Sequence, residues 1–340
     1  MKKREVLLLI IIFVSVIVLT GIGGFLISEK KNTKVTRKTD ANNDKFEETS
    51  DVSGVDTGLY SRDSFDGSIT YNGKRYEVNT AIDTLLFLGI DNSDQSREGV
   101  GIVEGGRSDT IILFAIDNKN KIITPLEINR DSMVDVDIYD NDGNYLAQGL
   151  EQLTMQYSYG RNAKQACNLT KNKISDLLCR TRIDSVISLT MDGIEPIVDS
   201  IGGVDLRLET DETQLDSSYV EGAFIHLDGA SAKDFVHIRD TEIRGSNIER
   251  MSRQTQFMLA LFQNIKMQGG SVIEKMENAA GDYLYEDVDA DSLVHLTEYE
   301  YSEKIYMLPG VNKTDGIHDE FYIDANKLTE MILDLFYLES

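Results

Sequence analysis

Charged side chains stand at the ends of short apolar runs in this 340-residue chain. Asp91 follows the run at residues 84–90, while Arg107 and Asp109 precede the run at residues 110–116. If the two runs form neighbouring strands, Asp91 and Asp109 converge at one end of a sheet. Two such carboxylates suit Mg²⁺, which takes one or two protein carboxylates together with phosphate oxygens of a substrate. The simpler alternative, in which each aspartate only caps a turn or a strand end, stays open at this point.

Arginines occupy the same kind of position. Arg130 follows the apolar run at residues 122–128, Arg239 follows a predicted helix, and Arg250 and Arg253 stand at the start of the next one. A single arginine of this kind is usually a salt-bridged surface residue. Several together indicate a clamp for phosphate or pyrophosphate, which a guanidinium binds through two parallel hydrogen bonds.

The helix that carries Arg250 has a marked start. Ser246 and Glu249 fit a capping box, so the helix should begin near residue 247. Arg250 and Gln254 then fall on one stripe with the apolar residues that follow them. Because a helix N-terminus is the positive end of the helix dipole, these first turns are suited to an anion.

Other chemistries receive no support from the sequence. Residues 101–108 nearly spell a phosphate-binding P-loop, but Arg107 replaces the required lysine and a strand follows instead of a helix. The serine-hydrolase motif Gly-x-Ser-x-Gly is absent. The formal net charge of −24 disfavours nucleic-acid binding. Cys167 and Cys179, the only cysteines, fall in one predicted helix about 18 Å apart, too far for a disulfide.

Three β-branched, almost continuously apolar runs, at residues 84–90, 110–116 and 122–128, predict strands buried on both faces. Helix-length stretches follow at residues 146–157, 162–178, 191–200, 228–237 and 247–267. We therefore predict an α/β fold, a three-layer α-β-α sandwich with a mixed central sheet. Residues 305–309 and 325–337 predict a further strand and helix.

The N-terminus predicts one transmembrane helix before this domain. Residues 6–27 carry no charge and are long enough to span a bilayer, and no cleavage site follows. We predict a cytoplasmic stub at residues 1–4, an uncleaved signal anchor at 5–28 and a polar extracellular linker at 29–80. Basic residues flank both sides of the anchor, so the positive-inside rule alone does not settle the orientation. A cytoplasmic domain is the alternative.

Six motifs occur in the order typical of the LytR-CpsA-Psr family of cell-envelope enzymes, and the chain resembles that family over roughly residues 83–266. The motifs are Leu86-Phe-Leu-Gly-Ile-Asp91, Gly106-Arg-Ser-Asp-Thr110, Ile128-Asn-Arg-Asp131, Ile201-Gly-Gly-Val-Asp205, His226-Leu-Asp-Gly229 and Glu249-Arg250-x-x-Arg253-Gln254-x-x-Phe257. The resemblance implies a catalytic domain at residues 81–270 that the acidic part at residues 271–340 completes.

The resemblance also implies a function. It predicts a membrane-bound extracytoplasmic phosphotransferase of a Gram-positive cell wall, which uses Mg²⁺ or Mn²⁺ to move a glycopolymer from undecaprenyl pyrophosphate to peptidoglycan. Weak pyrophosphatase activity and a hydrophobic groove for the polyprenyl tail belong to the same expectation.

Residue roles follow from the matched motifs. Asp91, Arg107 and Arg130 would be catalytic, with Asp91 as the base, and Asp91 and Asp109 would hold the metal. The pyrophosphate ligands would be Arg107, Arg130, Arg239, Arg250, Arg253 and Gln254.

The chain departs from the family's usual motifs at several positions. His237 stands where an arginine is common, and a mostly neutral imidazole grips an anion less firmly. Asn129 replaces a proline, and Gln152 replaces a lysine. Two other functions stay open: a non-catalytic or regulatory binder of the lipid-linked polymer, and a hydrolase that releases the polymer from its carrier.

Overall fold

The structure of the chain is a computed structural model. It describes residues 60–91, 106–238, 271–287, 299–302, 304–313 and 319–340, together with residues 253, 256, 257, 260, 261, 264, 267 and 268. Within these residues, no helix combines the length and the apolar character that crossing a membrane requires. The predicted anchor at residues 5–28 lies outside them.

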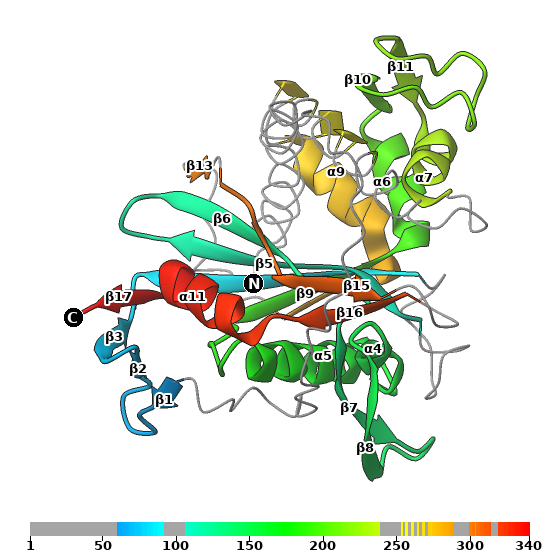
Figure 1. The fold of residues 1–340 in the computed structure, drawn as a ribbon. Helices are drawn as coiled ribbons and strands as arrows, with labels where there is room; N and C mark the ends of the chain where they lie inside the picture. The colour runs from blue at the N-terminus through cyan, green and yellow to red at the C-terminus, as the bar shows by residue number, and fades with distance from the viewer. Residues whose placement is uncertain are drawn as a thin grey trace, which may run out of the picture.

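A mixed sheet forms the centre of the molecule (Figure 1). Its strand order is β12-β9-β4-β5-β6-β13, and β14 also pairs with β6. β4 runs antiparallel to β5 but parallel to β9. The three apolar runs of the sequence form its middle, as predicted. The strands are β4 (Ile82–Ile90), β5 (Ser108–Asp117), β6 (Ile122–Glu127), β9 (Ser185–Thr190), β12 (Leu284–Asp287), β13 (Glu300–Tyr301) and β14 (Tyr306–Met307).

Helices cover both faces of this sheet (Figure 1). On one side lie α4 (Met155–Ser158), α5 (Ala163–Leu177) and α11 (Ala325–Phe336). On the other lie η1 (Met191–Gly193), α6 (Ile194–Ser200), α7 (Gly229–His237), α9 (Ser271–Ala280) and η2 (Gly281–Tyr283). The mixed α/β class with a mixed central sheet is therefore confirmed.

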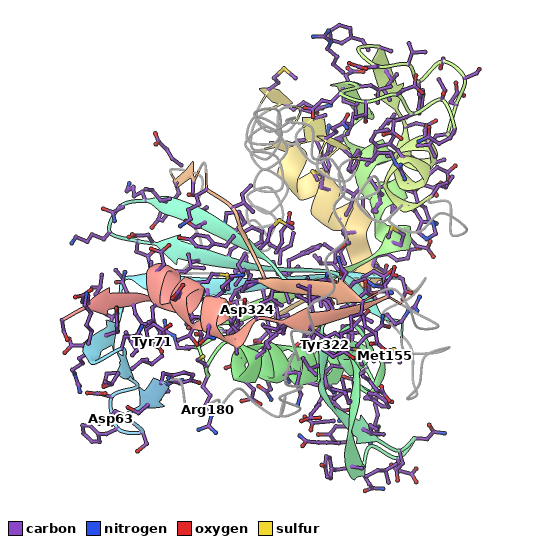
Figure 2. All side chains as sticks on the ribbon, viewed as in Figure 1. Asp63, Tyr71, Met155, Arg180, Tyr322 and Asp324 are labelled. Carbon is purple, nitrogen blue, oxygen red and sulfur yellow. The ribbon has the colours of Figure 1, made fainter. Side chains whose placement is uncertain are left out.

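Side-chain caps start three of these helices. Asn162, Asp228 and Asp324 each accept a hydrogen bond from a backbone N–H of the first turn of α5, α7 and α11. Figure 2 shows Asp324 at the start of α11, with Tyr322 on the preceding strand. The sequence placed all three helix starts within one or two residues.

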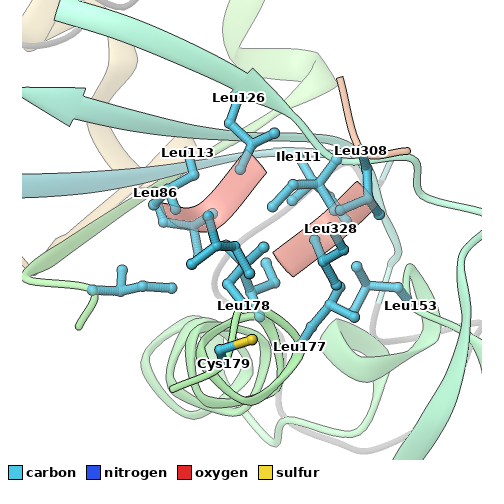
Figure 3. Packing of buried hydrophobic residues seen from close by; sticks show 14 of the residues in the cluster. Leu86, Ile111, Leu113, Leu126, Leu153, Leu177, Leu178, Cys179, Leu308 and Leu328 are labelled. Carbon is cyan, nitrogen blue, oxygen red and sulfur yellow. The ribbon is translucent and has the colours of Figure 1, made fainter. Parts of the chain in front are cut away.

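The main core lies between the sheet and the pair α5 and α11. Leu86, Leu113 and Leu126 project from adjacent strands toward Leu177 and Leu328, and all five are at most 4% exposed (Figure 3). The opposite face of the same strands carries a second apolar set: Leu85, Phe87, Ile112, Phe114, Ile116, Ile123 and Ile187. Apolar side chains on both faces explain why the strands read as continuous apolar runs.

The predicted linker ends earlier than expected. Residues 60–78 belong to a second sheet of order β1-β2-β3-β17, which joins the first described residues to the last. Asn72 (φ 51°) and Gly73 (φ 76°) form its tight turn, as suits a two-residue hairpin. This Asn-Gly signal was missed because the flanking residues are polar. The strands are β1 (Tyr60–Arg62), β2 (Ile69–Tyr71), β3 (Lys74–Val78) and β17 (Tyr337–Glu339).

The helix predicted at residues 146–157 is mostly a strand. β7 (Met133–Tyr139) and β8 (Tyr145–Gln152) form an antiparallel hairpin, and only the four residues of α4 are helical. Asp140 organises the turn by accepting hydrogen bonds from the backbone N–H groups of Asp142 and Asn144. Such aspartate turns hold the chain away from a helix.

Two smaller hairpins complete the described fold: β10 (Val204–Arg207) with β11 (Phe224–Leu227), and β15 (Gly310–Lys313) with β16 (Glu320–Ile323). The two cysteines are free and buried. Cys179 lies beyond the end of α5, at a positive φ of 56°, and so is not in the same helix as Cys167.

Candidate functional site

The candidate site lies at the end of the sheet where β4 ends and β5 begins. The antiparallel pairing sets Ile90 beside Ser108, with a register shift just before it that accommodates Asp109 as an extra residue. Gly89 permits this approach, because a Cβ there would stand 2.9 Å from the Cβ of Thr110. The strands therefore bring Asp91 and Asp109 to one end of the sheet, as predicted.

Asp91 and Arg107 form the outer pair of the site. The Asp91 carboxylate accepts hydrogen bonds from Nε (3.0 Å) and Nη2 (2.8 Å) of Arg107 through one oxygen. Its other oxygen accepts from the Arg107 backbone N–H at 2.5 Å. The Arg107 side chain is 37% exposed and that of Asp91 19%, so the pair faces solvent.

Arg130 forms the inner part. Its guanidinium pairs with Asp109 through Nη1 and with Asp131 through Nε, the latter at 3.1 Å. The side chain of Gln152 donates a hydrogen bond to the same Asp131 oxygen at 2.9 Å and another to the Asp319 carbonyl at 2.8 Å. Arg130, Asp109 and Asp131 are each 11–12% exposed at the side chain. Neighbouring carboxylates thus hold Arg130 in a fixed orientation.

The backbone around Arg130 is fixed by its neighbours. Asn129 accepts a hydrogen bond from the Asp131 N–H at 2.9 Å through its side chain, and so forms a turn just before Arg130. Thr154 donates its N–H to the Arg130 carbonyl (3.0 Å) and its hydroxyl to the Ser108 carbonyl (3.0 Å). Thr154 therefore ties the end of β6 to the start of β5.

We call Asp91, Arg107, Asp109, Arg130 and Asp131 the charged edge. Burial alone lowers the pKa of Arg107, but its hydrogen bond with Asp91 and the charges of Asp91, Asp109 and Asp131 outweigh burial and raise that pKa. All three carboxylates therefore act on one guanidinium.

The charged edge carries three carboxylates against two guanidiniums, a formal charge of −1. A divalent cation would make this charge positive and suit the edge to an anionic substrate. No group of three or more metal-binding side chains occurs among the described residues. Mg²⁺ needs only one or two carboxylates when a substrate supplies phosphate oxygens, and an aspartate can bind an arginine and a cation at once. The donor set of Asp91 and Asp109 thus fits such an ion.

Arg253 occupies a different environment from the one expected for a pyrophosphate ligand. It is only 2% exposed and pairs with Glu212, its Nη1 lying 3.2 Å from the carboxylate. Its remaining donors bond the carbonyls of Phe235 (2.8 Å) and Ile238 at the end of α7. Its position in the helix suggested a ligand, but the structure turns it into the protein interior, so we leave it out of the proposed site.

The other expected ligands, Arg239, Arg250 and Gln254, lie outside the described residues. His237, which replaces a common arginine, is exposed in the last turn of α7. Two residues of the site were missed as participants. Asp131 stood in a recognised motif without a role, and Gln152 was noted only as a departure from a lysine.

The chain is similar to a known family of proteins. The model of the LytR_cpsA_psr family matches residues 26–333. A polyisoprenyl-teichoic acid–peptidoglycan teichoic acid transferase, TagV of Bacillus subtilis (strain 168), is 27% identical over 66% of this chain and 52% of its own length. The transferase of that description named TagU, from Enterococcus faecalis (strain ATCC 700802 / V583), is 26% identical over 62% of this chain and 63% of its own length. The chain thus matches only about half to two thirds of each relative.

Solved structures show the same fold. TagT bound to LI-WTA superposes with a TM-score of 0.54 at 21% identity, over 75% of this chain and 90% of that one. The crystal structure of B. subtilis TagV gives a TM-score of 0.52 at 21% identity, over 75% of this chain and 96% of that one. Because the family model extends over most of the sequence, the chain belongs to the LytR_cpsA_psr family.

Proposed function

We propose that this protein transfers a glycopolymer from a polyprenyl-pyrophosphate carrier to peptidoglycan. The observation that carries the proposal is the charged edge, where fixed guanidiniums alternate with carboxylates at one end of the sheet. Phosphoryl transfer asks a protein mainly for positioning and for neutralisation of charge on phosphate oxygens. The similarity to the teichoic acid transferases TagV and TagU supports the same reaction class.

In the proposed reaction, an acceptor hydroxyl oxygen attacks the phosphorus that bears the polymer. The bond from this phosphorus to the bridging oxygen breaks, and the lipid phosphate leaves with the electron pair. Asp91 accepts the hydroxyl proton, while Arg107 and Arg130 orient the phosphates. Asp91 and Asp109 would hold Mg²⁺ or Mn²⁺, which when bound supplies further neutralising charge.

The second apolar set of the sheet supports a lipid substrate. Phe87 and Ile112 pair with each other on β4 and β5, one step inward on this face from Gly89 and Thr110, and both belong to the apolar set opposite α5 and α11. We propose that a polyprenyl tail runs toward this face while its phosphates stay at the edge. The protein would then bind both the pyrophosphate and the polyprenyl tail of the carrier.

The test is a transfer assay with full-length protein, Mg²⁺, a labelled lipid-linked donor and peptidoglycan. We expect label on peptidoglycan, and a loss of at least tenfold in Arg130→Ala. Arg182→Ala is the matched control. Arg182 also pairs with two aspartates, but its side chain is 67% exposed, and it lies just before the start of β9, at the end of the sheet opposite the charged edge.

Two results would contradict the transferase. Free polymer without label on peptidoglycan would indicate a hydrolase, and donor binding without any product would indicate a regulatory binder. Omission of peptidoglycan separates the transferase from a hydrolase: the transferase then leaves most of the donor intact, apart from weak pyrophosphatase activity, whereas a hydrolase releases free polymer at its full rate.

We also propose that residues 5–28 anchor the protein with its folded domain outside the membrane. Protease added to intact protoplasts should then digest the domain. Full protection of the domain would contradict both the orientation and the proposed function, because lipid-linked wall polymers are used outside.

A further inference from the structure

Glu127 is a carboxylate beside the site to which no role has yet been given. It is the last residue of β6, and side chains alternate between the two faces of a strand. Leu126 and Ile128 belong to the core with α5 and α11, whereas Ile123 belongs to the second apolar set. Glu127 therefore projects on the face of Ile123, where the polyprenyl tail is proposed to run.

On that face, the neighbours of Glu127 toward the middle of the sheet are apolar, and those toward the charged edge are polar. On β5, Glu127 pairs in register with Ile112, which is 3% exposed. The diagonal neighbour on the same face is Thr110, about 7–8 Å away, and Asp109 comes next. Arg130 follows three residues later in the chain. Glu127 thus marks the boundary between the charged edge and the apolar face.

The carboxylates of the charged edge all have arginine partners, and Glu127 differs from them. In the part of the chain that the structure describes, no hydrogen bond or ion pair is formed by its side chain. Burial raises its pKa, since nothing nearby compensates for the loss of water around the ionised form. Burial therefore shifts this unpaired carboxyl group toward its neutral form, compared with an exposed glutamate.

We propose that Glu127 binds a phosphate oxygen of the lipid pyrophosphate as a neutral carboxylic acid, at the point where the phosphates end and the tail begins. This inference rests on the proposed function. A neutral carboxyl donates one hydrogen bond, whereas its ionised form would repel the anion. The approach of the pyrophosphate stabilises the protonated form further, so binding takes up a proton whenever the free carboxyl is ionised.

The charged groups around Glu127 do not supply that proton-linked behaviour. Arg107 and Arg130 remain charged throughout the accessible pH range. Asp91, Asp109 and Asp131 are each paired with one of these arginines, whereas Glu127 is not. On the strands packed beside β6, Asp117 and Glu300 lie next to Ile122 at the opposite end, and β14 carries no charged residue. His237 is exposed at the end of α7 and is controlled by its own variant.

The experiment measures the binding of farnesyl-pyrophosphoryl-N-acetylglucosamine to full-length protein by calorimetry. This pyrophosphate diester has no titrating group near neutral pH, so any proton taken up binds to the protein. Titrations at constant Mg²⁺, between pH 5.5 and 8.5 and in two buffers of different ionisation enthalpy, give the number of protons per ligand. We expect uptake to rise toward one proton, with affinity falling by up to tenfold per pH unit above the pKa of free Glu127.

Four variants make the assignment specific. Glu127→Gln keeps a neutral donor of similar shape, so it should bind the probe with an affinity independent of pH and without proton uptake. Glu127→Ala should bind about tenfold to a hundredfold more weakly at pH 5.5, the loss of one hydrogen bond to a charged group. Glu300→Gln and His237→Gln should keep the wild-type uptake.

Each remaining outcome contradicts the proposal. Binding without proton uptake, or the same uptake in Glu127→Gln, overturns the role of Glu127 and leaves the proposed function standing. Uptake that disappears in His237→Gln assigns the proton to the histidine. If the wild-type protein does not bind the probe at all, the proposed function fails and this inference fails with it.

Discussion

Two groups of arginine and carboxylate side chains in this protein look alike in sequence and differ in structure. At the charged edge, Arg130 lies between Asp109 and Asp131, and the outer pair of Asp91 and Arg107 is open to solvent. Arg253 and Glu212 instead have side chains only 3% and 4% exposed. The charged edge has a net negative charge and is partly open to solvent, whereas Arg253 and Glu212 neutralise each other inside the protein.

The difference teaches how to separate a ligand-binding arginine from a structural one. Arg253 uses its guanidinium to bond one carboxylate and two backbone carbonyls at the end of α7. Thr210 and Gln214 donate to the same Glu212 carboxylate. A buried arginine whose donors already bond protein oxygens stabilises the fold, but it offers no hydrogen-bond donor to a substrate. The predictions below test whether this distinction holds.

The largest expected effect is on stability. Glu212→Ala removes the only carboxylate that faces the buried Arg253 among the described residues, and an uncompensated buried charge costs about 3–5 kcal/mol. We expect that loss in the free energy of unfolding by urea denaturation. Lys74→Ala is the control, because it breaks an ion pair whose members are 58% and 53% exposed and should cost at most about 1 kcal/mol. Equal losses in the two variants would remove the structural distinction.

The next effect is on activity. Asp109→Asn should reduce glycopolymer transfer by an order of magnitude or more, because a neutral amide is a poorer ligand for a hard cation and a weaker partner for Arg130. The Mg²⁺ concentration for half-maximal activity should rise in the same variant. Normal activity with an unchanged Mg²⁺ requirement would contradict the metal site. Unfolding in urea serves as the control and should change little.

Much of this organisation could be predicted from the sequence, and the failures have physical reasons. The strands around Asp91, Asp109 and Arg130 were predictable because buried strands leave long β-branched apolar runs. β3 and β8 were missed because their residues are mostly exposed, so their apolar pattern is weak. β1 and β2 have only three residues each, too few to show a pattern. For such strands the turn residues carry the signal.

Side-chain partners were harder to predict than positions. Arg253 stands three residues after Arg250 in one motif, and nothing in that spacing reveals that Glu212, 41 residues earlier, occupies the space beside it. Glu127 was missed for a related reason: only the pairing of β6 with β5 shows that it borders the site. Long-range contacts of this kind depend on the assembled sheet. The roles of Arg239, Arg250 and Gln254 stay predictions.

A moderate loss of donor affinity should show whether the charged edge needs the planar shape of the Arg130 guanidinium or only its positive charge. Arg130→Lys keeps the positive charge but loses the planar fork that faces Asp109 and Asp131. We expect donor affinity to fall by about tenfold, less than in Arg130→Ala, with folding intact. Arg253→Lys should leave donor affinity unchanged and lower the free energy of unfolding instead. If both lysine variants lost only affinity, Arg253 would belong to the site after all.

The smallest effect is expected at an exposed ion pair that belongs to neither group. Asp334 accepts hydrogen bonds from Lys304 (2.7 Å) and the Tyr306 hydroxyl (2.5 Å), which together lower its pKa, although its side chain is 57% exposed. Because the folded-state pKa lies below the unfolded one, the pair stabilises the protein above the ordinary aspartate pKa of about 3.9. That contribution disappears as the pH falls through the lowered pKa. Asp334→Asn should therefore cost at most about 1 kcal/mol at pH 7. This cost should decrease as the pH falls below about 3.9 and vanish once the pH lies below the lowered pKa. Urea unfolding of both proteins over this pH range measures the difference in their free energies of unfolding.

A cost that stays constant with pH would show that Asp334 acts through packing. A cost as large as that of Glu212→Ala would show that exposure does not set the strength of ion pairs here.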